Sequence, residues 1–143
     1  MSQMTNYLEN QLVDHIFRNQ TFSAPANLYI SLHTADPGET GASEISGNNY
    51  GRATVASSLA NWAGTQAAAS TTASSGTGGV TSNNNAITFA TPSATWGTIT
   101  HFAIWDAVST GNPLLYGELT TSKTINSGDT VSFAAAALTV TFA

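Results

Sequence analysis

The chain has 143 residues with a formal net charge of −5, and only three of its residues are Lys or Arg. Three cations cannot neutralise the several phosphates that a nucleic-acid site engages, and they also disfavour binding to an anionic membrane surface. Cys is absent, so disulfides and thiolate metal sites are excluded. The length suits one domain over residues 1–143, and no apolar run reaches the roughly 18 residues of a membrane-spanning helix, so membrane insertion is not expected.

An amphipathic pattern predicts one helix over residues 3–19. Apolar residues recur with helical spacing at Met4, Tyr7, Leu8, Leu12 and Ile16, with Val13 and Phe17 beside them. Asn6 and Glu9 resemble a capping box, and Thr5 and Ser2 are the alternative caps. The stripe is wide enough for a helix that packs on its own sheet, which we expect. Contact with a neighbouring subunit or a carrier protein is the other interpretation.

Alternating apolar and polar residues predict about eight short strands after the helix. They cover residues 28–33, 52–58, 86–89, 98–105, 114–119, 122–126, 130–133 and 137–142. A hairpin turn is expected at 126–129, where Gly128 can adopt a positive φ. The predicted fold is mainly β: an antiparallel, jelly-roll-like β-sandwich over residues 27–142 with one N-terminal α-helix.

The strand at 98–105 is predicted to be buried on both faces. Alternation places Phe102 and Ile104 on one face and Ile99, Ala103 and Trp105 on the other. Bulky groups on both faces are typical of a strand at the centre of a sandwich. The aromatic side chains of this strand are therefore expected in the core.

Two polar segments are the expected contact surfaces, because loops carry most binding residues. They are the loop at 35–49 and the low-complexity stretch at 62–82, for which we expect an extended loop or an irregular strand. Among the aromatic residues, Trp62 is the best candidate for an exposed interface or ligand contact, and Tyr50 is a second.

Asp36, Glu39 and Glu44 in the first of these loops are further candidates for interface or ligand contact. Carboxylates and loop carbonyls together suit Ca²⁺, but the loop lacks the EF-hand pattern. A solvated acidic loop is therefore the favoured interpretation, and no metal site is predicted.

Other chemical signatures are missing from the sequence. The His residues, at positions 15, 33 and 101, show no i, i+4 pairing of the kind found in metal sites. The chain has no Gly-x-Ser-x-Gly elbow, and no P-loop Lys follows the glycines at 76–79. Neither a catalytic site nor a cofactor site is predicted.

Several blocks of the sequence resemble a known family. The blocks are TNYLENQLVDHIF at 5–17, APANLYISLHTADPGE at 24–39, NNYGR at 48–52 and WGTITHFAIWDAVSTGNPLLYGELTTSKTINSGDTVSF at 96–133. In this order they are similar to small structural proteins of tailed bacteriophages that are usually labelled phage tail fibre proteins. The resemblance covers nearly the whole chain and implies a non-enzymatic virion component, with a head-decoration (cement) protein as the related interpretation.

From the resemblance and the charge-poor composition, we expect an oligomeric accessory protein on the outer surface of the capsid or tail. Its expected partners are further copies of itself, as a homo-oligomer with a trimer as the expected state, and the major capsid protein or tail proteins. A carbohydrate-binding, lectin-like module that recognises a host-surface glycan is the alternative. An enzyme is the third and least favoured class.

Overall fold

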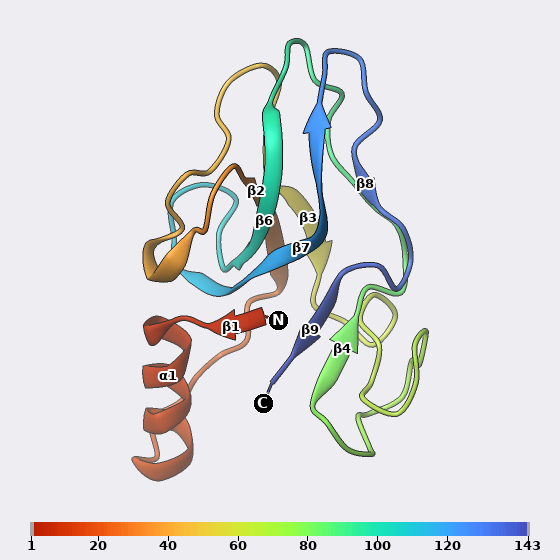
Figure 1. Cartoon of the computed structure of the whole chain (residues 1–143). Helices are drawn as coiled ribbons and strands as arrows, with labels where there is room; N and C mark the ends of the chain where they lie inside the picture. Colours follow the sequence, from red (N-terminus) through yellow and green to blue (C-terminus); the bar gives the residue numbers. More distant parts are fainter. Residues whose placement is uncertain (1, 143) are drawn as a thin grey trace.

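A five-stranded antiparallel sheet forms the centre of the computed structural model, which describes residues 2–142 (Figure 1). Its order is β1 (Ser2–Met4), β7 (Pro113–Ile125), β6 (Gly97–Trp105), β2 (Asn27–His33) and β3 (Ala53–Ala56). Two short ribbons pair β4 (Val80–Ser82) with β9 (Thr139–Thr141), and β5 (Ile87–Thr88) with β8 (Ser132–Phe133). Helix α1 covers Asn6–Phe17, and a 3-10 turn, η1, covers Gly38–Thr40. The predicted mainly β, antiparallel fold with an N-terminal helix is confirmed.

Strand β6 is the central strand, because it pairs with β2 on one side and with β7 on the other. Its last four residues, Phe102 to Trp105, are all buried, which confirms the predicted burial on both faces. On one face, Phe102 meets Phe133 of β8 edge-on, with 6.4 Å between the ring centroids. On the other face, Trp105 lies under the loop that joins β2 to β3.

Strand β7 corrects one prediction: it is unbroken where a gap was expected between two strands, at 120–121. The polar residues there coincide with a register shift. Ile99 pairs with Lys123, whereas His101 pairs with Glu118, so β7 advances five residues while β6 advances two. A break in the apolar pattern therefore marked a bulge and not a turn.

The register shift also changes the face on which Ile99 lies. Ile99 lines a hollow together with Leu32 and Phe133, on the side of the sheet that Phe102 occupies. Simple alternation had placed it on the face of Trp105. Alternation fails here because extra residues in one strand of a pair change which face of the sheet the neighbouring side chains occupy.

The N-terminal residues join the sheet, so the predicted helix start at residue 3 is wrong. Met4 lies in β1 and pairs with Leu115 of β7. The helix also ends at Phe17 and not at residue 19, because Asn19 takes a φ of 55°, which lies outside the right-handed helical region. No helix in the described part of the chain is long and apolar enough to cross a membrane.

Thr5 caps helix α1, in place of the capping box considered for Asn6 and Glu9. Its hydroxyl accepts a hydrogen bond from the Leu8 amide at 3.3 Å, which satisfies one free N–H of the first turn. The same hydroxyl donates to the Pro113 carbonyl at 2.6 Å. Because Thr5 is fully buried, the cap also anchors the helix to the start of β7.

Most of the remaining strands lie within their predicted ranges but are shorter. Strand β4 lies inside the 62–82 stretch and pairs with β9 near the C-terminal end of the chain. The predicted turn at 126–129 is confirmed: Asp129 donates its amide to the Asn126 carbonyl at 3.2 Å, and Gly128 takes a φ of 83°.

Trp105 holds the loop between β2 and β3 on the sheet. The Arg52 guanidinium carbon lies 3.6 Å from the centroid of the buried indole ring. Gly41 also touches the ring, since it takes a φ of +70° and an added Cβ would lie 2.1 Å from a ring carbon. Arg52 in turn donates two hydrogen bonds to the Glu44 carboxylate, at 2.8 Å and 2.7 Å. These contacts fix the loop as a layer over this face of the sheet.

A chain of hydrogen bonds continues from Trp105 into the sheet. Trp105 Nε1 donates to Ser31 Oγ at 2.7 Å, and Ser31 Oγ lies 2.7 Å from His33 Nε2. His33 Nδ1 lies 2.7 Å from the Ala42 carbonyl. A carbonyl only accepts, so His33 Nδ1 carries a proton. The Ser31 hydroxyl also lies 3.3 Å from the Ala103 carbonyl, to which it can donate. Burial lowers the pKa of His33 below the ordinary value, which favours the neutral ring.

Gly41→Ala is expected to destabilise the fold by about 2–4 kcal/mol, because the new methyl group overlaps the Trp105 ring and Ala disfavours a positive φ. Urea unfolding measures the loss. Gly38→Ala is the matched control: its φ is +53°, but no atom lies within 4 Å of an added Cβ. The control should therefore lose only about 1 kcal/mol from the backbone. Equal losses in the two variants would show that the ring contact is not the cause.

The protein should lose stability as the pH falls below about 6.5. The unfolded chain then binds a proton at His33, whereas the folded chain, with its lowered pKa, does not. The free energy of unfolding therefore falls by up to about 1.4 kcal/mol per pH unit from this residue. Urea unfolding at several pH values measures the slope, which His33→Gln should reduce and the exposed-site variant His15→Gln should not. A slope that survives in His33→Gln contradicts the assignment.

Candidate contact surfaces

Two of the predicted contact residues, Tyr50 and Glu44, belong to the layer around Trp105. The Tyr50 hydroxyl accepts from the Leu32 amide and donates to Glu44 Oε1, both at 3.0 Å. Its ring packs edge-on against Trp96. Burial raises the pKa of Tyr50 well above its ordinary value. These contacts tie the loop to the sheet, and a role in binding stays a prediction for both residues.

Asp36 and Glu39 lie in the same loop with different partners. Asp36 Oδ1 accepts from the Gly38 amide at 2.9 Å. Glu39 Oε2 accepts from the Asn6 amide at the start of α1, where a helix favours negative charge. Burial, together with the charge of Glu39, raises the pKa of nearby Tyr116. Within residues 2–142, no group of three or more His, Asp or Glu side chains is arranged to hold a metal ion.

Trp62 is half-buried beside an exposed apolar side chain. It lines a shallow hollow with Leu59, which is 55% exposed, and forms an isolated β-bridge with Asn83. Its Nε1 atom is buried with no hydrogen-bond partner in the described part of the chain, an arrangement that costs stability. Its position on the surface is compatible with the predicted contact role, which stays a prediction.

The C-terminal end of α1 exposes an apolar patch. Val13, Ile16 and Phe17, which we call the helix patch, are 48%, 66% and 80% exposed. Figure 1 shows this end of the helix, drawn in red, pointing away from the sheet. Leu8 is buried, and Leu12 packs partly against the core. The apolar stripe thus divides into a half that packs on its own sheet, as expected, and a half that stays exposed.

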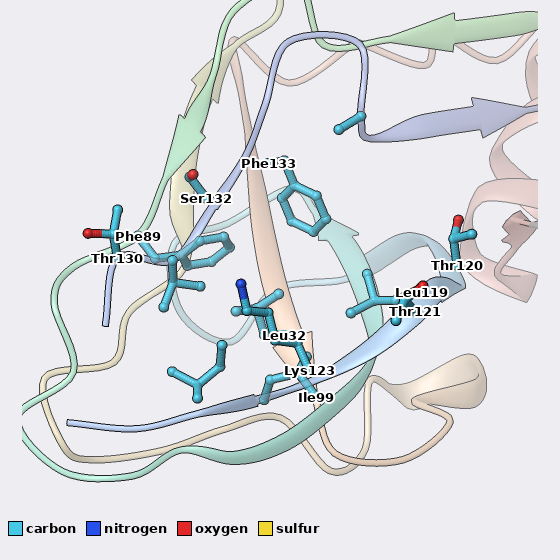
Figure 2. Close-up of a pocket in the computed structure, with 13 residues that line it drawn as sticks. Leu32, Phe89, Ile99, Leu119, Thr120, Thr121, Lys123, Thr130, Ser132 and Phe133 are labelled. Atoms are coloured by element: carbon cyan, nitrogen blue, oxygen red, sulfur yellow. The ribbon is translucent and has the colours of Figure 1, made fainter. Parts of the chain in front are cut away.

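A hollow of about 360 Å³ opens between β7 and the β5–β8 ribbon, and we call it the β7–β8 hollow (Figure 2). Apolar side chains from the sheet and the ribbon form its walls, among them Leu32, Phe89, Ile99, Ile125, Val131 and Phe133. Polar side chains also line it, namely Lys123, Thr120, Thr121, Thr130 and Ser132. Sequence reasoning missed this site, because its walls come from distant segments and because alternation placed Ile99 on the opposite face.

Comparison with known protein families gives a match over nearly the whole chain. The family model described as podophage GP4 fiber I protein gp80 matches residues 3–141. No curated protein matches the chain. The family match supports the resemblance to phage tail fibre proteins and associates the protein with the virion. The chain belongs to the podophage GP4 fiber I protein gp80 family and is a structural protein of a phage fibre.

Proposed function

We propose that the protein acts by contact alone, as a homo-oligomeric subunit of a phage fibre whose copies associate through the helix patch. The observation that carries this proposal is the exposure of Val13, Ile16 and Phe17 on one end of α1. Covering three such side chains contributes roughly 3–6 kcal/mol per copy, since full burial of one is worth about 1.5–3 kcal/mol and each is already partly covered. Further copies present the same patch, and three of them can meet around one axis, so an apolar contact is available without any other partner.

The charge distribution supports assembly at this patch. Arg18 borders it, but its guanidinium is already paired with Asp14 at 2.7 Å. Little charge must therefore lose water when the patch is covered. Only 8% of the residues are charged, so the surface outside the helix patch is also poor in charge and suits contact with neighbouring subunits.

A function without catalysis agrees with how the titratable side chains are used. Glu44 is paired with Arg52, and Asp14 with Arg18. His33 is fully buried within its hydrogen-bond chain. These groups hold the structure together and do not converge on a shared cleft where substrate chemistry would take place.

The proposed state is a trimer on the outer surface of the virion, with tail proteins as its further partners. Membership in a fibre family favours the tail over the capsid.

A cement role on the major capsid protein is the alternative. The copy number per purified particle, measured by mass spectrometry against the major capsid protein, separates the two. A small multiple of the tail symmetry supports a fibre subunit, and a number on the scale of the capsid protein supports cement.

Phe17→Ser is expected to weaken self-association at least about tenfold, because it removes apolar area that a partner copy covers. Light scattering after size-exclusion chromatography measures the oligomer. Val108→Ser is the matched control: Val108 is 59% exposed but lies outside the helix patch. Both variants should keep the wild-type melting temperature at a protein concentration too low for association, because association itself stabilises the folded state. A wild-type monomer at high concentration, or equal weakening in both variants, contradicts the proposed interface.

A further inference from the structure

We propose that the β7–β8 hollow is a binding site for an acidic sugar, a pyranose ring that carries a carboxylate. The site lies on the sheet and the β5–β8 ribbon, outside the helix patch, so this inference does not depend on the oligomeric state. It gives the fibre subunit a ligand as well as neighbours. The argument uses the size of the hollow, its one cation and its hydroxyl groups.

The size of the hollow selects a small ligand. Its volume of about 360 Å³ lies near the lower end of the range of roughly 300–1,000 Å³ that small-molecule sites occupy. A single ring fits this volume better than a long acyl chain does. Phe133 is half-buried in the wall and supplies an aromatic surface on which the C–H face of a sugar ring can pack.

Lys123 supplies the charge. It is the single lysine of the chain, and the other two cations, Arg18 and Arg52, each have a carboxylate partner. Lys123 makes no ion pair with any side chain of residues 2–142. Figure 2 shows its amine directed into the space between Phe89 and Phe133. An unpaired ammonium beside apolar walls attracts an anionic group and can hold it with a charge-assisted hydrogen bond.

Hydroxyl groups complete the site. Those of Thr120, Thr121, Thr130 and Ser132 line the hollow; these residues are exposed, and no hydrogen bond joins their hydroxyls to another described residue. An aliphatic carboxylate would pair with the ammonium alone, because its chain carries no group that these hydroxyls can bind. A carboxylated sugar satisfies both, because its own hydroxyls donate and accept. The combination therefore favours an acidic sugar over a fatty acid.

The experiment is an NMR titration of the full-length protein with matched small molecules. D-glucuronate and N-acetylneuraminate carry the ring and the carboxylate, D-glucose carries only the ring, and decanoate carries only the carboxylate on a chain. We expect saturable shifts at Phe89, Lys123 and Phe133 with at least one acidic sugar, and at least about tenfold weaker binding of glucose. Equal binding of glucose, tighter binding of decanoate, or no shift at these residues with either acidic sugar overturns the proposal.

Lys123→Gln should weaken binding of the acidic sugar about tenfold, as expected for loss of one charge-assisted hydrogen bond. Arg18→Gln removes a cation outside the hollow and is the matched control, with no expected change in affinity. Phe17→Ser should also bind the sugar normally, so failure of the helix-patch interface and failure of this site are distinguishable. Equal effects of Lys123→Gln and Arg18→Gln would show that only the net charge matters, and would overturn the assignment of Lys123.

Discussion

Packing on the Trp105 indole is the interaction on which the rest of the structure depends. The ring closes one face of the central strand and meets the Arg52 guanidinium and Gly41. Arg52 also donates to the carbonyls of Ala107 and Thr110, both at 2.9 Å. This one side chain therefore joins the β2–β3 loop to the β6–β7 loop. Its side chain is only 6% exposed. Because the cost of removing water from a buried ion pair offsets much of its attraction, we infer that its main effect is to give these loops one position.

The features that the sequence predicted are those with a local signal. The helix and the strand around Phe102 carry full periodic patterns, and both were found. Strands β1 and β4 have three residues each, which is too short for a period to show. The first was therefore assigned to the helix, and the second fell in a stretch for which an extended loop or an irregular strand was expected. The register shift at Ile99 is a property of a pairing and has no signature in either strand alone. The β7–β8 hollow depends on that shift and was missed for the same reason.

Uncharged polar side chains hold this fold together where other proteins use ions. Asn83 is almost fully buried: its amide nitrogen donates to the carbonyls of Asn85 and Ala134, and its amide oxygen accepts from the Leu138 amide, each at 2.8 Å. Neutral hydrogen bonds of this kind do not depend on salt as surface ion pairs do. The contacts that Asn83 makes are therefore largely independent of ionic strength.

The buried Thr5 cap has a mechanical consequence. Helix α1 is attached to the sheet at its N-terminal end, through the hydrogen bond from Thr5 to Pro113, while the helix patch lies at the free end. In the proposed oligomer, a load applied by a neighbouring copy at Phe17 passes along the helix axis to Thr5. There β1 and β7 are paired over three residues, so the force divides among several backbone hydrogen bonds next to the central strand. The helix would then connect the proposed interface directly to the sheet.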